Sequence, residues 1–272
     1  MGWTVTDDVE VFRRATADHL RAHRVACTVV LTIVERLRMP GAAAEDGPPE
    51  LAWWDGDGGA VIARTPPHRP VVSAMSPAAA AAWAAAQPCP ERVLGPADTV
   101  EHLARAWGAT TEPVVTERLH RLERLRPPVD PPPTRRAVAG DADLLWSWLL
   151  EFHHEATPDD PVPPRAAMDA AVAEGRAVVA LAGGEPVAYA SASPVMLGTV
   201  RIGPVYTRPA HRGNGHGAAV AAAAARHARE RGADEVLLFT DLDNPTSNAL
   251  YARLGFVGVT DIVDARLVPA ST

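Results

Sequence analysis

Apolar and polar positions follow the same order of patterns in the two halves of the chain. In the second half, short apolar runs bounded by glycine, proline or polar residues predict buried strands. The predicted strands cover 135–138, 177–181, 186–193, 199–207 and 236–240. Amphipathic or alanine-rich segments predict a helix that opens at Asp141, a helix over 165–175, a helix over 218–231 and a short helix after residue 244.

The first half shows a similar succession of segments. One or two helices are predicted within 7–38, because apolar residues there keep a helical spacing. Strands are predicted over 51–54, 60–63, 71–75 and 93–96, and helices over 78–86 and 97–107, while 114–125 fits either a helix or a strand. Since the order echoes that of the second half, we expect a degenerate copy of the same fold.

Loops separate these elements, and one of them marks a domain boundary. Polar or proline-rich loops are predicted over 41–50 and 158–164. Residues 126–134 carry prolines at 127, 128, 131, 132 and 133, which exclude a helix or a central strand there. The sequence predicts an N-terminal α/β domain over 1–126, a stiff linker over 127–134 and a larger α/β domain with a mixed sheet over 135–272.

Composition narrows the class of protein. The 272 residues carry a formal net charge of −7, all the basic residues are arginine, and 47% of the chain is hydrophobic. This acidic balance argues against a nucleic-acid partner. Asp7 and Asp8 interrupt any signal-like start, and the longest apolar run is too short to span a membrane. We therefore expect a cytoplasmic protein without a membrane anchor, as a monomer or homodimer.

A glycine-rich turn joins the predicted strand 199–207 to the helix 218–231. Its sequence is Arg212-Gly213-Asn214-Gly215-His216-Gly217. Glycines remove the Cβ atoms that would keep a phosphate away from the backbone, and the first turn of a helix offers N–H groups without partners. The turn therefore predicts a binding site for a nucleotide-like anion.

A dinucleotide-binding turn is one reading of this segment. Residues 213–218 satisfy G-x-G-x-x-G/A, and Asp241 follows near the end of the next strand. Residues 207–211 separate the strand from the glycines, however, and too little chain follows Gly255 for a second mononucleotide half. A lysine-containing phosphate loop is excluded, because the chain has no lysine.

Arg212-x-x-Gly215-x-Gly217 resembles the R/Q-x-x-G-x-G/A signature of the GNAT acetyltransferase superfamily. Asn244, Tyr251 and the run 254–256 lie where that family places its second coenzyme-contacting segment. Residues 239–248 look like those of a bacterial subgroup with an additional N-terminal domain. The resemblance covers 135–268 well and 1–130 loosely, and it implies a GNAT fold and acetyl-CoA as the donor.

The resemblance also implies roles for individual residues. The coenzyme would be bound by Val205, Tyr206, Thr207, Arg212, Gly213, Asn214, Gly215, His216, Gly217, Ala218, Asn244, Ser247 and Tyr251. The diphosphate would lie on the N–H groups of 213–218, and the pantetheine along 205–207. A backbone N–H near Tyr206 would face the thioester oxygen as it gains charge. No metal is expected.

Direct attack of an amine on a thioester needs an acid for the thiolate and a base for the ammonium. Tyr251 suits the acid, because a phenol has a pKa close to that of a thiol. Glu155 suits the base, since it follows Phe152 in the Phe-x-x-Glu pattern of the subgroup, and Glu151 lies one helical turn earlier. Alternatively, Tyr251 only packs beneath the coenzyme, and Glu155 is an ordinary solvated carboxylate.

The sequence thus predicts an acetyl-CoA-dependent N-acetyltransferase that acts on an amine of a small molecule or peptide. A non-catalytic acyl-CoA-binding or regulatory module is the main alternative, and a dinucleotide-binding oxidoreductase is the third. The N-terminal domain would bind no coenzyme, because it lacks a counterpart of the glycine-rich turn.

Overall fold

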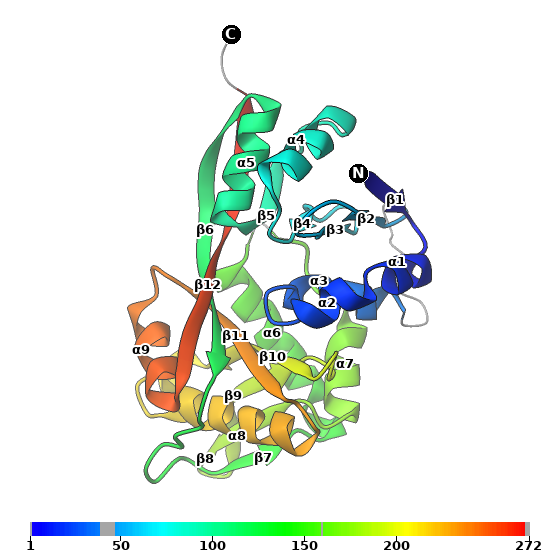
Figure 1. Cartoon of the computed structure of the whole chain (residues 1–272). Coiled ribbons are helices and arrows are strands. Elements are labelled where there is room, and N and C mark those ends of the chain that lie inside the picture. The colour runs from blue at the N-terminus through cyan, green and yellow to red at the C-terminus, as the bar shows by residue number, and fades with distance from the viewer. Residues whose placement is uncertain (1, 39–46, 159, 270–272) are drawn as a thin grey trace. The chain divides into compact units, whose positions relative to one another are not determined.

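The chain divides into two compact units in a computed structural model that describes residues 2–38, 47–158 and 160–269. Unit 1 comprises Met1–Leu119, Asp241–Asp243 and Val259–Thr272, and unit 2 comprises His120–Thr240 and Asn244–Gly258. Both are mixed α/β structures built around a sheet (Figure 1). The loops expected over 41–50 and 158–164 fall partly on residues outside this description.

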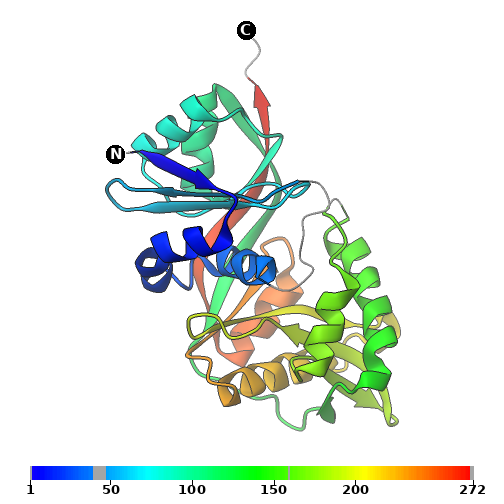
Figure 2. The same cartoon turned by 90° about the vertical axis from the view of Figure 1, so that its right-hand side faces the viewer.

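Unit 1 has helices on both faces of its sheet (Figure 2). Its strands are β1 (Trp3–Thr6), β2 (Glu50–Trp54), β3 (Ala60–Arg64), β4 (Val71–Val72), β5 (Arg92–Pro96) and parts of β6 (Ala109–Leu122) and β12 (Phe256–Pro269). Its helices are α1 (Val9–Ala15), α2 (Ala17–Ala22), α3 (Thr28–Leu37), α4 (Pro77–Ala86) and α5 (Ala97–Trp107). Buried residues of α4 and α5, among them Trp83 and Leu103, form a core with Ile62, while α1 and α3 contact the strands β2 and β3.

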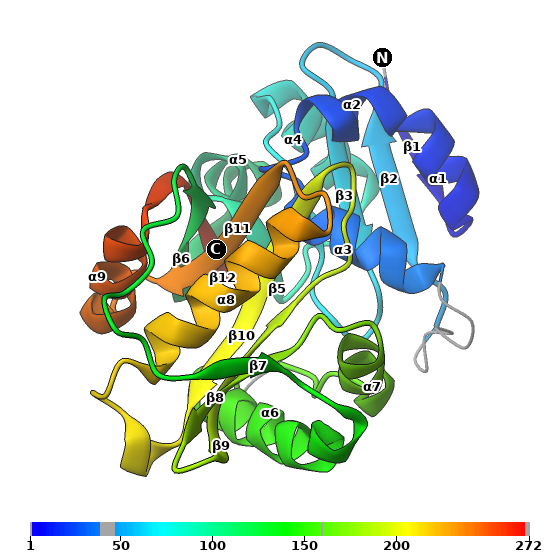
Figure 3. The same cartoon turned by 90° about the horizontal axis from the view of Figure 1, so that it is seen from below.

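Unit 2 also carries helices on both faces of its sheet (Figure 3). Its strands are β7 (Thr134–Arg136), β8 (Val178–Ala182), β9 (Glu185–Ala192), β10 (Thr199–Thr207) and β11 (Glu235–Asp241). The last residues of β6 and the first residues of β12 also belong to it. Its helices are α6 (Ala142–Ala156), α7 (Arg165–Ala173), α8 (His216–Glu230) and α9 (Pro245–Leu254). Side chains alternate across the strands, so that Val178 packs with α8, whereas its neighbour Val179 packs with α6 and α7.

The two halves of the chain repeat one order of elements. Each runs through a strand, helices, antiparallel strands, a helix, a strand parallel to the one before that helix, a further helix and a long strand. The parallel pairs are β4 with β5 and β10 with β11. The repetition agrees with the expected copy of the fold, and the GNAT-like character of the N-terminal half stays a prediction.

The long strands at the end of each half are exchanged. β12, which follows the elements of unit 2, pairs antiparallel with β5 of unit 1 over Ile262 to Arg266. β6, which follows the elements of unit 1, lies next to β11 in the strand order, and its last residues belong to unit 2. The contacts assign residues 259–272 to unit 1 and residues 120–133 to unit 2, so the two units are not continuous in sequence. The predicted linear division into domains 1–126 and 135–272 stays a prediction.

Most predicted elements are present, but some details differ. The one or two helices expected within 7–38 are three, α1, α2 and α3. The strand expected over 71–75 is only Val71–Val72. Ser73 still donates its N–H to the carbonyl of Val61 on β3 at 2.9 Å, and the residues after it lead into α4. The ambiguous segment 114–125 is part of the strand β6. The strands β1 and β12 are additional to the elements predicted from the sequence.

Candidate active site

The glycine-rich turn leads directly into α8. Gly213 and Gly215 have φ values of +80° and +79°, which L-residues rarely adopt, and Gly215 is the N-cap of the helix. No side chain caps this end of α8. The N–H groups of the first helical turn have no intrahelical acceptor, and the backbone of residues 213–215 is exposed. The turn can therefore receive an anion.

The corresponding helix of unit 1 begins differently. Ser76 is the N-cap of α4, and its Oγ accepts a hydrogen bond from the N–H of Ala79 at 3.2 Å. Pro77 at the first helical position has no N–H. The N–H of Met75 donates to Oγ1 of Thr99 at 3.2 Å. A side-chain cap and a proline thus leave fewer open N–H groups at the start of α4 than at the start of α8, which agrees with the expectation that unit 1 binds no coenzyme.

The strand before the turn separates from its parallel neighbour. β10 pairs with β11 only over Thr199 to Arg201, and then continues beside β9 to Thr207 after an irregularity between Ile202 and Val205. The edge of β10 that faced β11 is therefore not paired with that strand at residues 205–207. Backbone groups on this edge are positioned for an extended, amide-containing chain such as pantetheine.

Gly217 lies close to both this strand and α9. A Cβ built at Gly217 would lie 3.4 Å from Oγ1 of Thr207 and 3.8 Å from Cδ1 of Leu250. One at Gly215 would lie 3.8 Å from Cδ of Pro132. The turn is thus bordered by the end of β10, by α9 and by the proline-rich segment, a neighbour that the sequence did not reveal.

Arg212 is paired within the protein. Its Nη2 donates to both carboxylate oxygens of Glu155, at 3.1 Å and 2.7 Å, and its Nε donates to the carbonyl of Thr207 at 3.0 Å. The guanidinium also lies 5.7 Å from the ring centre of Tyr206. Arg212 and Glu155, predicted separately for coenzyme and base, are therefore partners of one ion pair.

Glu151, one helical turn before Glu155, contacts a different residue. The Tyr206 hydroxyl donates to Oε2 of Glu151 at 2.5 Å. Burial, followed by the hydrogen bond to Glu151, raises the pKa of Tyr206 to about 12, so this hydroxyl keeps its proton. The sequence identified Tyr206 only through its backbone and gave no direct signal for this pairing.

The helix α9 places the predicted acid on the opposite face of the sheet. Tyr251 is 8% exposed, packs edge-on against Phe256 at 5.8 Å, and belongs to the core formed with α8. Burial raises the pKa of Tyr251, which keeps the phenol protonated. Gly255 ends α9 at φ +95°, and a Cβ there would lie 1.9 Å from the carbonyl oxygen of Arg124, so only glycine fits.

The polar residues at the start of α9 serve the helix itself. Oδ1 of Asn244 accepts from the N–H of Ser247 at 3.0 Å, which makes Asn244 the N-cap. Asn248, which the sequence analysis did not select, accepts from Oγ1 of Thr240 at 2.5 Å and donates to the Asn244 carbonyl at 2.9 Å. These bonds fix the start of α9 and with it the position of Tyr251.

His216 contributes its backbone rather than its ring. The side chain is 7% exposed, and burial, assisted by His211, lowers the pKa of His216. A neutral, buried imidazole adds no charge for a phosphate. Its N–H at the first position of α8 remains part of the turn.

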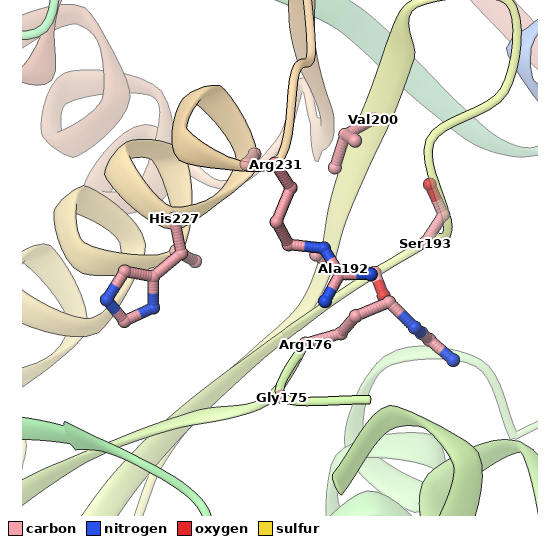
Figure 4. Close-up of a pocket in the computed structure, with 9 residues that line it drawn as sticks. Gly175, Arg176, Ala192, Ser193, Val200, His227 and Arg231 are labelled. Atoms are coloured by element: carbon pink, nitrogen blue, oxygen red, sulfur yellow. The ribbon is translucent and has the colours of Figure 1, made fainter. Parts of the chain in front are cut away.

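A pocket of unit 2 lies at the C-terminal end of α8, away from the glycine-rich turn (Figure 4). His227 lines it together with Arg176 and Ser193. Arg176 donates to the Glu174 carboxylate at 2.7 Å and to the Ala192 carbonyl at 2.5 Å, so its charge is used within the fold. No predicted site residue lines this pocket.

The described residues contain no group of three or more His, Cys, Asp or Glu side chains that could hold a metal ion. Over the same ranges, no helix is long and apolar enough to cross a membrane.

Comparisons with known proteins agree with this geometry. Residues 142–256 match the sequence model described as the Acetyltransferase (GNAT) family. A mycothiol acetyltransferase from Saccharomonospora viridis is 39% identical over 75 residues, which are 26% of this chain and 24% of that protein. The chain thus matches only about a quarter of the length of this curated relative.

Three solved structures resemble nearly the whole chain. A Drosophila protein has a TM-score of 0.65 at 16% identity and covers 99% of both chains. A GCN5-related N-acetyltransferase from Sphaerobacter thermophilus has a TM-score of 0.61 at 17% identity, covering 97% of this chain and 95% of that one. One from Kribbella flavida has a TM-score of 0.58 at 21% identity, covering 92% and 96%. At these identities the likeness concerns the fold alone.

The fold, the uncapped turn and the matched segment together resemble those of GNAT acetyltransferases. Within the chain, it is the segment 142–256 that is similar to the GNAT family. The predicted fold class is thereby confirmed, and the predicted resemblance to the GNAT family is present over residues 142–256.

Proposed function

We propose that the protein transfers the acetyl group of acetyl-CoA to the nitrogen of an amine by direct attack on the thioester. The observation that carries this proposal is the open N-terminus of α8, which follows a strand that has just left its parallel neighbour. An anion-binding turn, preceded by a strand stretch that is not paired with β11, suits a ligand with a diphosphate followed by an amide-containing arm.

The residues would divide the binding as follows. The N–H groups of residues 213–218 would hold the diphosphate, and the strand edge at Val205, Tyr206 and Thr207 would hold the pantetheine amides. Asn244 and Ser247 would border the arm from the start of α9. Acetyl-CoA itself supplies the activated acetyl group, and no metal is proposed.

Tyr251 would give its proton to the departing thiolate. Its hydroxyl is protonated at neutral pH and comes from the α9 face of the sheet, while burial moves its pKa further above that of a thiol. A backbone N–H near Tyr206 would stabilise the negative charge that develops on the thioester oxygen. Glu155 as the base stays a proposal, and its ion pair with Arg212 would first have to open.

The ligand class is tested by calorimetry with acetyl-CoA, CoA, NAD and ATP. We expect saturable binding of acetyl-CoA and CoA, one per chain, and none of NAD. Binding of NAD without acetyl-CoA would contradict the proposal. Thiol release across a panel of amines then separates an enzyme from an acyl-CoA-binding module, since a module would bind acetyl-CoA and release no thiol with any amine.

A further inference from the structure

Glu151 differs from Glu155 in what balances its charge. Glu155 forms an ion pair with Arg212, at 2.7 Å. Glu151 is exposed and accepts one hydrogen bond, from the neutral hydroxyl of Tyr206. Within the described ranges, no arginine or histidine forms an ion pair with Glu151. Of these two carboxylates on α6, only that of Glu155 has a cationic partner among the described residues.

The hydroxyl of Tyr206 fixes where this charge lies. A 2.5 Å bond from a hydroxyl to a carboxylate is in the short, charge-assisted range. The ring of Tyr206 is held in turn, because the residue is 3% exposed and lies 6.3 Å from the ring of Trp148. A rigid side chain thus holds one oxygen of an otherwise mobile surface glutamate.

The pair of Tyr206 and Glu151 lies beside the stretch of β10 that is proposed to bind the coenzyme. Tyr206 belongs to the stretch of β10 that has left β11, the stretch proposed to hold the thioester end of the coenzyme. Successive side chains of a strand alternate between faces, so Tyr206 packs on the α6 face, whereas Val205 packs toward α8. Glu151 is therefore one tyrosine side chain away from the reacting segment, on the face opposite Tyr251.

Opposite faces suit the two partners of an acyl transfer. The thiolate leaves near its proton donor, which is proposed to be Tyr251 in the α8 and α9 core. An incoming amine then has the α6 face available, where a fixed carboxylate attracts a cation and repels an anion.

We propose that the Glu151 carboxylate, held by the Tyr206 hydroxyl, binds the ammonium form of the acceptor and selects amines that carry no carboxylate beside the amino group. The bound ammonium gives one proton to the proposed base, Glu155, before the neutral amine attacks the thioester. This inference rests on the proposed function and deepens it. The substrate class is then a cationic amine, such as an amine side chain or a peptide N-terminus, rather than a free amino acid.

The test compares two acceptors that differ in one charged group. Alaninamide carries an ammonium beside a neutral amide, and alanine carries it beside a carboxylate. We expect the wild type to acetylate alaninamide with the higher kcat/KM. Glu151→Gln keeps the shape and removes the charge, so the alaninamide-to-alanine ratio of kcat/KM should fall about tenfold, mainly through KM for alaninamide, with KM for acetyl-CoA unchanged.

Two further variants separate positioning from general effects. Tyr206→Phe keeps the ring and removes the hydroxyl. It should lower the alaninamide-to-alanine ratio of kcat/KM by a smaller factor, because the Glu151 carboxylate remains but loses the hydrogen bond that positions it. Glu185→Gln removes an equal charge from the exposed end of β9 and should leave the ratio as in the wild type. A melting curve for each variant identifies any loss of folding.

Each result decides between the proposals. An unchanged ratio in Glu151→Gln, with an active wild type, overturns this inference and leaves the proposed function intact. A wild type that prefers alanine overturns it as well. A wild type that binds acetyl-CoA and acetylates no amine overturns the proposed function, and the inference with it.

Discussion

Asp264 on β12 is fully buried and accepts two hydrogen bonds from Arg92 on β5, at 3.1 Å and 2.5 Å. Arg69 approaches the same carboxylate at 2.7 Å. Removal of one partner from such a group leaves buried charge without compensation. This ion-paired group fastens the last strand of the chain to unit 1.

Asp264→Asn should therefore lower the free energy of unfolding by about 3–5 kcal/mol in chemical denaturation. Asp261→Asn is the matched control, because Asp261 lies on the same strand and pairs with Arg118 while its side chain is 37% exposed. That change should cost less than about 1 kcal/mol. Equal losses for the two variants would contradict the role given to the buried pair.

The exchanged strands predict that residues 134–272 do not fold alone. This fragment lacks the end of β6 and leaves β12 without β5, and it loses the bonds from Glu123 and Arg126 to Gly255 and Leu254. Co-expression with residues 1–133 should restore a soluble one-to-one complex. A cooperative melting transition of the isolated fragment would show this expectation to be wrong.

Gly215→Ala should weaken acetyl-CoA binding and also lower stability, since alanine at φ +79° is strained by about 1 kcal/mol. Gly232→Ala is its control. Gly232 has φ +88° near the other end of α8, with no atom within 4 Å of a built Cβ. It should lose a similar stability while calorimetry shows wild-type affinity. Unchanged affinity in Gly215→Ala would place the diphosphate elsewhere.

Tyr251→Phe should reduce turnover by roughly 10²–10⁴ with acetyl-CoA affinity nearly unchanged, the range for loss of one proton donor. The control is Tyr189→Phe. Tyr189 is fully buried on β9, and within the described ranges its hydroxyl has no hydrogen-bond partner. Its removal should leave turnover as in the wild type. Wild-type turnover in Tyr251→Phe would remove this tyrosine from the mechanism.

Asp141 gives a pH-dependent contribution to stability. Its carboxylate accepts from Arg135 at 2.6 Å and 2.9 Å and from the N–H of Val138, and the Arg135 bond is the main reason that the pKa of Asp141 is lowered. A lowered pKa stabilises the fold above the unfolded value of about 3.9, and this stability is lost as pH falls further.

Asp141→Asn should thus be less stable than the wild type by about 1–2 kcal/mol at pH 7. The two proteins should converge as the pH falls below about 4. Urea denaturation across this pH range provides the measurement. A difference that stays constant down to pH 2 would mean that the carboxylate charge is not the cause.

Local sequence patterns predicted the elements near the glycine-rich turn, because these elements depend on interactions between residues close in sequence. The Gly183-Gly184 hairpin, Pro77 at the start of α4 and the glycines before α8 depend on backbone preferences that one residue or two can express. The fold and family followed from these segments. The exchange of β6 and β12 has no such signal, since strand partners far apart in sequence are chosen by packing.

The site was predictable through its backbone and less so through its side chains. The turn 213–217 and the position of Tyr251 followed from the motif. The pairing of Arg212 with Glu155, and of Tyr206 with Glu151, depends on how α6 packs across β10, which a single sequence does not specify. The contact of Pro132 with Gly215 is a similar case. The prolines of its segment exclude a helix or a central strand, but they do not indicate which residues the segment contacts.

The exchange of the long strands also bears on synthesis at the ribosome. Although residues 1–119 precede the rest, the strand β5 acquires its neighbour β12 only after residues 262–266 have been made. The sheet of unit 1 therefore stays incomplete, with the edge of β5 unpaired on the side of β12, until unit 2 has been translated. The order in which the chain is made is thus not the order in which its halves can be completed, and the exposed edge of β5 is where a chaperone would be needed most.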